Sequence, residues 1–189
     1  MPAPPRKRSA EATRAAILDA ARARFGEGGF DRVRVRDVAA DAGVDAALVV
    51  RYFGGKEALF AEAAAFDLRL PDLRGLPRDG VATVLLDRFL AVWEHDAGFL
   101  SLLRAAASSP AAAEAMLGVF TGQVAPALAA IAVDRPAERA ALVGSQVLGL
   151  AFTRYVLRVP PLAAMGREEL GAWIGPVLER YLLDPSPLG

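Results

Sequence analysis

A short stretch from Val35 to Phe53 constrains the fold of this chain more than any other part of the sequence. Apolar side chains recur at helical spacing before Gly43 and again after Asp45, so each half can bury one face of a helix. Glycine tolerates the left-handed backbone of a tight turn, and an aspartate can cap the helix that follows it. The stretch therefore predicts two short crossed helices joined by a turn at Gly43.

The residues that face away from this core give the first indication of function. Val49 and Phe53 fall on the inner side of the second helix, and Ala39 is small where the two helix axes approach closely. In a helix-turn-helix unit, the second helix lies in the major groove of DNA. The pattern therefore predicts a DNA-reading surface. Its outward positions on the second helix are Ala46, Ala47, Val50 and Arg51.

Charge is distributed unevenly along a chain whose net charge is zero. Residues 1–60 carry eleven Lys and Arg against eight Asp and Glu, a net charge of +3, whereas residues 61–189 carry a net charge of −3. Local cations replace counterions on phosphates whatever charge the far end carries. The amino-terminal part is therefore the better candidate for contact with nucleic acid.

The sequence has no cysteine, no secretory signal pattern and no apolar run that approaches the roughly 18 residues of a membrane span. The absence of cysteine excludes Cys-based zinc, iron-sulfur and redox chemistry and fits a reducing compartment. We therefore expect a cytoplasmic, nucleoid-associated protein without a membrane partner.

Helical periodicity extends along nearly the whole sequence, and strand patterns are absent. A first helix is expected at 12–26, ended by a pair of glycines, and a fourth runs from Lys56 to about Leu70, where a proline stops it. After a linker rich in proline and glycine, Gly and Pro signals separate five more helices. These are expected near 79–96, 98–107, 111–132, 136–158 and 167–183.

The block from Thr13 to Phe60 resembles the N-terminal DNA-binding domain of the tetracycline-repressor-like (TetR) family of transcriptional regulators. The remaining two thirds resemble the C-terminal regulatory domain of that family, and the stretch LVGSQVLGLAFTRYVLRV is similar to helices of actinobacterial members. The matching positions are Thr13-Arg14, Ile17-Leu18, Ala20-Ala21, Phe25, Gly29-Phe30, Val35 to Ala39, Ala42-Gly43-Val44, Tyr52-Phe53, Lys56-Glu57 and Leu59.

The resemblance implies a homodimer whose two helix-turn-helix units bind successive major grooves, about 34 to 36 Å apart. It also implies that an unknown small-molecule effector binds a cavity in the C-terminal bundle, moves the two readers apart and releases the DNA. The expected protein is thus a ligand-responsive regulator, a repressor that binds a palindromic operator of double-stranded DNA.

We therefore predict an all-α protein of about nine helices, with a three-helix helix-turn-helix DNA-binding domain and a C-terminal helical bundle for ligand binding and dimerisation. The expected domain boundaries follow the composition of the chain. They are a disordered basic arm at 1–11, the DNA-binding domain at 12–57, the regulatory and dimerisation domain at 58–184 and a flexible tail at 185–189.

The resemblance also indicates individual DNA contacts. Arg36 stands where an arginine can pair with guanine through two hydrogen bonds, and Lys56 stands where the family has a phosphate-contacting lysine. Arg34 replaces the usual Ser or Thr with a cation, while Tyr52 either donates its hydroxyl to a phosphate or belongs to the core. The expected DNA-binding residues are Arg34, Arg36, Asp45, Ala46, Ala47, Leu48, Val50, Arg51, Tyr52 and Lys56.

The reading helix carries few side chains that can form hydrogen bonds. Leu48 and Val50 occupy positions where the family usually has Thr and Tyr. Two alternatives follow. Either sequence specificity depends on Arg36 and Arg51 together with apolar contact, or part of this face packs against protein.

The C-terminal region offers candidate residues without a motif. Trp93, Phe120, Gln123 and Phe152 are candidates for the wall of an effector cavity, with core packing as the alternative. The expected helix at 136–158 is apolar almost all round, so with the final helix it predicts a four-helix interface between subunits, an ordinary bundle interior being the alternative. The expected interface residues are Gly144, Val147, Leu148, Gly149, Phe152, Trp173, Val177 and Tyr181.

Enzyme signatures are missing from the sequence, which has no GxSxG elbow, no phosphate-binding loop, no HExxH pair and no dinucleotide-binding fingerprint. We therefore expect no catalytic residues, no cofactor and no metal site. The alternative function is a helical adaptor. It would use the apolar face of the second helix, around Leu48 to Val50, and the C-terminal bundle for protein-protein contact. DNA binding with a steep salt dependence would favour the regulator, because phosphate contacts release counterions.

Overall fold

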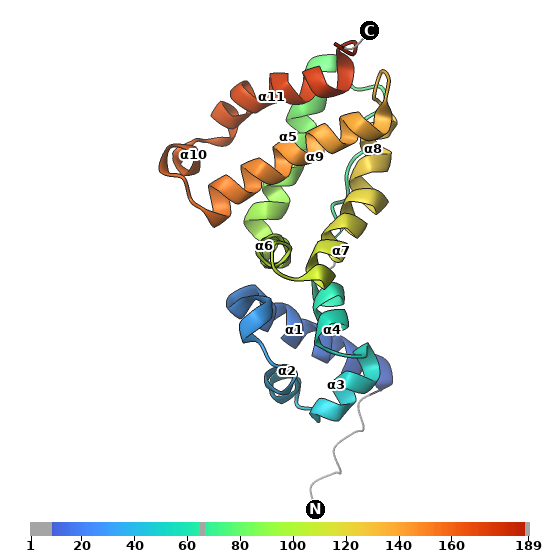
Figure 1. Cartoon of the computed structure of the whole chain (residues 1–189), viewed down its shortest axis with the longest axis vertical. Coiled ribbons are helices and arrows are strands. Elements are labelled where there is room, and N and C mark those ends of the chain that lie inside the picture. Colours follow the sequence, from blue (N-terminus) through green and yellow to red (C-terminus); the bar gives the residue numbers. More distant parts are fainter. Residues whose placement is uncertain (1–8, 65–66, 188–189) are drawn as a thin grey trace, which may run out of the picture.

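The computed structural model describes residues 9–64 and 67–187, and every regular element in these ranges is helical (Figure 1). Helices α1 to α4 form a head at one end of the molecule, and α5 to α11 form a larger body at the other end. The all-α prediction is confirmed. Most of the predicted arm at 1–11, and the last two residues of the predicted tail, lie outside the described residues.

Helix α1 (Ala10–Arg32) is longer than predicted, because the glycine signal bends the helix before its last turn. Ser9 caps its start by accepting a hydrogen bond from the backbone N–H of Ala12 at 3.1 Å. At Gly29 the backbone adopts a φ of 70°, which glycine tolerates, and helical geometry is interrupted there. The predicted range of 12–26 was therefore too short.

Helices α2 (Val35–Ala42) and α3 (Ala46–Phe53) form the predicted helix-turn-helix. Gly43 between them has a φ of 66° and a ψ of 40°, the left-handed conformation expected for the turn. Asp45 caps α3, since its carboxylate accepts a hydrogen bond from the Ala47 N–H at 2.7 Å. Both helices, the turn and the cap are confirmed.

Buried side chains from all four head helices form one hydrophobic core, which extends into the body. Leu102 and Ala105 of α6 and Ala112 of α7 belong to this same core. The head and the body therefore share side-chain packing. The members from the head itself are Ile17, Ala21, Phe25, Val33, Val38, Ala39, Ala42, Val49, Phe53, Leu59, Phe60, Ala63 and Ala64.

Helix α4 (Lys56–Ala63) ends well before the predicted Leu70. Beyond the two undescribed residues the chain is not helical, and Leu68 contacts the body there. The side-chain oxygen of Gln123 accepts a hydrogen bond from the Leu68 N–H at 2.7 Å, and Arg69 adopts a positive φ of 44°. The predicted extension of this helix to Leu70 was wrong.

The body helices lie close to their predicted positions. The helix predicted at 111–132 contains a π-helical turn, and the helix predicted at 136–158 ends in one. A short helix, α10, was not predicted; two prolines open it, as proline is tolerated in the first helical turn. The elements are α5 (Arg78–His95), α6 (Ala97–Ala105), α7 (Pro110–Val119), η1 (Phe120–Val124), α8 (Ala125–Ala129), α9 (Pro136–Ala151), η2 (Phe152–Val156), α10 (Pro160–Ala164) and α11 (Arg167–Leu183).

Helix α5 belongs to the body, where α11 packs against it and α6 follows at its end (Figure 1). Leu85, Leu90 and Trp93 of α5 are almost fully buried. Among the helices of the described ranges, none combines the length and the apolar composition that a bilayer-spanning segment requires.

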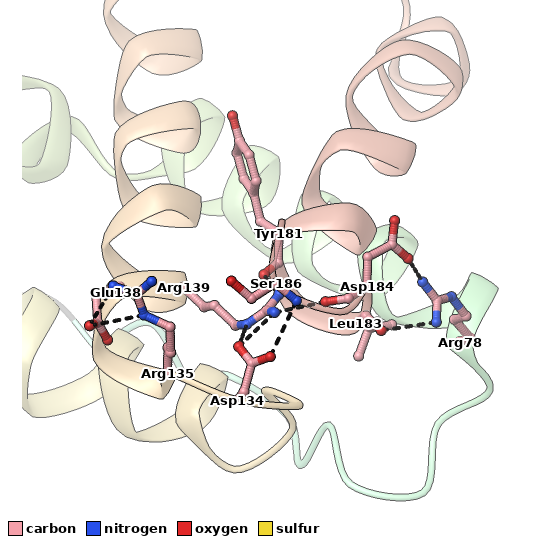
Figure 2. Close-up of polar contacts among 9 residues, drawn as sticks. All are labelled: Arg78, Asp134, Arg135, Glu138, Arg139, Tyr181, Leu183, Asp184 and Ser186. Atoms are coloured by element: carbon pink, nitrogen blue, oxygen red, sulfur yellow. Dashed lines mark hydrogen bonds and ion pairs between the residues drawn. The ribbon is translucent and has the colours of Figure 1, made fainter. Parts of the chain in front are cut away.

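A buried arginine joins the start of α9 to the end of α11 (Figure 2). Arg139 is only 6% exposed and donates hydrogen bonds to Asp134 Oδ1 and to the Asp184 carbonyl oxygen, both at 2.7 Å. Asp134 also accepts a hydrogen bond from the N–H of Ser186 at 3.3 Å. Arg78 of α5 pairs with the Asp184 carboxylate, so one network links three helices.

Candidate nucleic-acid interface and regulatory cavity

The outer face of α3 is largely hydrocarbon. Val50 is 48% exposed, and Ala47 and Arg51 are exposed beside it. Ala46 and Leu48 are half-buried, and Ala46 packs partly against the head core. Val50, Ala47 and Arg51 therefore project from the head, whereas Ala46 and Leu48 lie at the edges of this face.

Two arginines at the start of α2 are available at the same end of the head. Arg34 is exposed in extended backbone at the N-cap, where its N–H donates to Asp37 Oδ2 at 3.3 Å. The Arg36 side chain is 68% exposed, and its Nε lies 3.8 Å from Asp37 Oδ1. An exposed ion pair of this length is weak, so the Arg36 guanidinium is free to change partner.

Asp45 has a structural role in addition to the DNA contact expected from sequence. Its carboxylate oxygen caps α3 by accepting the Ala47 N–H. An N-cap of this kind stabilises a helix by about 1 kcal/mol. Asp45 therefore fixes the start of α3.

Lys56 and Tyr52 are both half-buried. The Lys56 ammonium lies 4.3 Å from the centroid of the Phe30 ring and donates to the Asp31 carbonyl oxygen at 3.4 Å. This contact ties the start of α4 to the last turn of α1. The Tyr52 ring packs partly against the head core, and the Arg51 guanidinium lies 5.7 Å from its centroid.

A small cavity of about 50 Å³ lies between the helices of the body. Of the four predicted wall residues, Trp93 and Phe120 line it. Gln123 and Phe152 do not line it. The Gln123 amide oxygen accepts a hydrogen bond from the Leu68 N–H, and Phe152 packs against the body core. The lining residues are Leu68, Phe89, Trp93, Phe99, Met116, Val119, Phe120, Val124, Gly144, Val147 and Leu148.

The cavity wall is made of apolar side chains and is rich in aromatic rings. The Trp93 ring is stacked between Phe89 and Phe99, with centroid distances of 5.9 and 6.0 Å. A site for a drug-sized molecule needs roughly 300 to 1,000 Å³, so such a ligand requires the wall to move. Val119 was not singled out from the sequence, because nothing distinguishes it there from an ordinary core residue.

A polar cluster lies beside the aromatic stack. Tyr155 meets Trp93 edge-on at 6.0 Å and donates its hydroxyl to Glu94 Oε1 at 3.1 Å, and Arg167 forms an ion pair with the same carboxylate. Burial opposes ionisation of Glu94, but the hydrogen bonds from Arg167 and Tyr155 outweigh it and hold the pKa of this carboxyl below its ordinary value. In the described part of the chain, no cluster of His, Asp or Glu could hold a metal ion.

The outer faces of α9 and α11 expose large apolar side chains. Trp173 is 67% exposed and Leu142 is 47% exposed. An open groove between the two helices is lined by Val177 and Tyr181 among others, and Gly149 faces open space. Four of the predicted interface residues, Gly149, Trp173, Val177 and Tyr181, therefore lie at this surface or in its groove.

The other predicted interface residues point into their own subunit. Val147 is only 4% exposed, and a Cβ added at Gly144 would lie 2.8 Å from a ring carbon of Phe120. These two positions cannot contact a second copy, which corrects the prediction. Leu148 lines the cavity and Phe152 packs against the body core. The sequence pattern could not separate the two faces, because this helix is apolar on both.

Two family models match the chain. Residues 17–63 match the model described as bacterial regulatory proteins of the tetR family, and residues 79–182 match the tetracyclin repressor-like C-terminal domain. Together they span the helix-turn-helix and the body. A search of curated protein sequences gave no match.

Solved structures give the same result. A TetR-family regulator (SCO0857) from Streptomyces coelicolor A3 is 30% identical, with a TM-score of 0.67 over 96% of this chain and 100% of that chain. NalD of Pseudomonas aeruginosa, the secondary repressor of the MexAB-OprM multidrug efflux pump, is 19% identical, with a TM-score of 0.67 over 93% and 98%. A regulator from Saccharomonospora viridis, solved with choline, is 18% identical, with a TM-score of 0.62 over 88% and 97%. The last two show the fold alone.

Proposed function

Since the chain belongs to the TetR family of bacterial regulatory proteins, and is thus a DNA-binding transcriptional regulator and not an enzyme, we propose that it is a homodimeric repressor. In this proposal it binds a palindromic operator in the cytoplasm and a small molecule releases it. The observation that carries the proposal is the capped α3, whose exposed face includes Arg51 and which lies at the end of the head farthest from the body.

The DNA contacts divide by chemistry. Arg36 supplies a bidentate contact to guanine, because its guanidinium is exposed and, among the described residues, forms a single long ion pair. Arg34, Tyr52 and Lys56 contact phosphates, and Lys56 exchanges the Asp31 carbonyl for a phosphate oxygen. The outer face of α3, from Asp45 to Arg51, lies against the base edges.

A second copy of the chain covers the outer faces of α9 and α11. An exposed tryptophan and an exposed leucine on neighbouring helices form an apolar surface of the kind that subunit interfaces bury. Two such helices from each subunit make a four-helix interface. Gly149→Arg places a charge in this surface without disturbing its own subunit, since nothing lies within 4 Å of the position.

The effector is a neutral, apolar molecule, because the cavity wall offers aromatic and aliphatic side chains and no charge. Met116 of α7 lines the cavity and also packs against the head core, where Ala112 of the same helix is fully buried. A ligand that enlarges the cavity therefore displaces α7, and α7 contacts the head directly. This contact gives the effector a physical route to the reading helix.

The test is selection of binding sites by the full-length protein from duplexes with a randomised centre, followed by fluorescence anisotropy at several salt concentrations. We expect a palindromic consensus, and a steep loss of affinity with salt as counterions rebind the phosphates. Arg36→Ala and Lys56→Ala should weaken binding, whereas Arg74→Ala, an exposed arginine outside the head, should not.

Gly149→Arg should sediment as a monomer and lose operator binding. A protein that enriches no sequence would contradict the proposal, as would affinity that Arg36→Ala and Lys56→Ala leave unchanged. Salt-insensitive binding to other proteins through the apolar face of α3 would instead favour the alternative function, a helical adaptor.

A further inference from the structure

The base-reading face of α3 is almost without hydrogen-bonding side chains. Its exposed positions are Ala47, Val50 and Arg51, of which only Arg51 is polar. Ala47 and Val50 stand three residues apart, so their side chains are neighbours on one face of the helix. Val50 is the largest exposed hydrocarbon side chain of α3, at 48% exposure.

The polar side chains around this face are already engaged in contacts of their own. The Asp45 carboxylate caps the helix through the Ala47 N–H, and Tyr52 is half-buried beneath the Arg51 guanidinium. Direct hydrogen-bonded readout in the described part of the head therefore falls to the arginines, foremost Arg36 of α2.

The major groove presents one feature that a hydrocarbon side chain can bind favourably, which is the 5-methyl group of thymine. Against the other base edges, Val50 would cover hydrogen-bonding groups and leave them without water or a partner, which costs free energy. A valine facing the bases therefore selects for thymine and against the polar edges of the other bases.

We propose that Val50, supported by Ala47, reads the 5-methyl groups of thymines in each half-site, while Arg36 supplies the guanine contact. This inference rests on the proposed function, since it requires α3 to lie in the major groove. The exposed Arg51 of α3, with the exposed Arg34 and Arg36 at the start of the preceding helix, favours a nucleic-acid occupant over an apolar protein surface, because arginines complement phosphate charge.

The test uses the palindromic duplexes that the full-length protein selects. Each thymine of a half-site is replaced in turn by deoxyuridine, which removes the 5-methyl group and leaves the hydrogen-bonding edges unchanged. We expect one or two positions in each half-site at which affinity falls about fourfold for each methyl lost. The same replacement outside the half-sites serves as the control and should have no effect.

The protein partner of the methyl group is identified with Val50→Ala. This variant should bind the thymine duplex more weakly, and deoxyuridine at the sensitive position should then cause no further loss. The slope of affinity against salt should stay unchanged, because Val50 touches no phosphate. Val133→Ala changes a valine of the body that is exposed to a similar extent, at 54%; this variant is the matched control and should behave as wild type.

Three outcomes would overturn this inference without contradicting the proposed function. These are selected half-sites without thymine, deoxyuridine duplexes bound as tightly as thymine duplexes, and a deoxyuridine loss that persists undiminished in Val50→Ala. Failure to enrich any duplex would instead overturn the proposed function, and the inference with it.

Discussion

The head and the body differ in how their helices are held in place. In the head, Gly43 and Asp45 fix the turn and the helix start through their own backbone and near neighbours. In the body, Arg139 and Gln123 bind segments more than 40 residues away along the chain. The comparison teaches that local geometry specifies the turn and the start of α3, whereas contacts between residues far apart in the sequence hold segments of the body in place.

The largest effect is expected from the buried arginine of the body. Arg139→Met removes the only cation that binds Asp134 Oδ1 and the Tyr181 and Asp184 carbonyl oxygens among the described contacts. Buried acceptors that lose a charged donor are costly, so we expect a loss of about 3 kcal/mol in the free energy of unfolding. Urea unfolding followed by tryptophan fluorescence at a fixed protein concentration measures it.

The matched control is Arg74→Met, which removes an exposed arginine paired with Asp72. Exposed ion pairs contribute little, so the urea midpoint of this variant should equal that of wild type. If both variants unfold at the same midpoint, the Arg139 network does not hold the body together.

The contrast between local and long-range contacts also explains how much of the fold could be predicted. The turn at Gly43 and the cap at Asp45 were predicted because these residue types favour those conformations. The end of α4 was not, since the chain that follows it makes a distant contact, in which the Leu68 N–H donates a hydrogen bond to the Gln123 side-chain oxygen. No sequence pattern around Leu68 indicates that its partner is Gln123, 55 residues further along the chain.

The second effect tests the head. Gly43→Ala forces a side chain into a backbone with a φ of 66°, which costs about 1 to 2 kcal/mol for an L residue. No atom lies within 4 Å of the added Cβ, so the cost comes from the backbone alone. Limited proteolysis should cleave the head of this variant faster than that of wild type, and its affinity for the operator should be lower.

Gly43→Asn provides the comparison for this position. Asparagine tolerates the left-handed region better than alanine, so it should recover part of the loss. Equal behaviour of the two variants would mean that the turn does not depend on its positive φ.

The candidate site was predicted unevenly for a related reason. The outer face of α3 follows from helical spacing around Val49 and Phe53, which the structure buries. The cavity depends on gaps between packed helices, and its apolar residues look like any core. A helical wheel could not show that Gly144 is buried against Phe120 whereas Gly149 is exposed, because both are glycines in one apolar helix.

The third effect exploits that difference in environment within the body. Gly144→Ala places a Cβ 2.8 Å from the Phe120 ring, so we expect a loss of about 1 kcal/mol despite the better helix propensity of alanine. Gly118→Ala is the control, because that helical glycine is exposed with nothing within 4 Å, and it should gain about 0.5 to 1 kcal/mol. The Tm of the two variants should shift in opposite directions. Equal shifts would mean that the Phe120 ring does not pack against Gly144.

The smallest effect is a pH dependence from the polar cluster of the body. Burial disfavours the charged form of Glu94, but the hydrogen bonds from Arg167 and Tyr155 win, so its pKa lies below the ordinary 4.5. The folded protein therefore binds this proton less readily than the unfolded chain, and the stabilisation is present above pH 4.5 and lost as pH falls through the folded pKa. The Tm difference between wild type and Glu94→Gln should be largest near neutral pH and shrink below pH 4.5. A difference that stays constant down to pH 3 would mean that the carboxylate charge contributes nothing to the packing of α5 against α11.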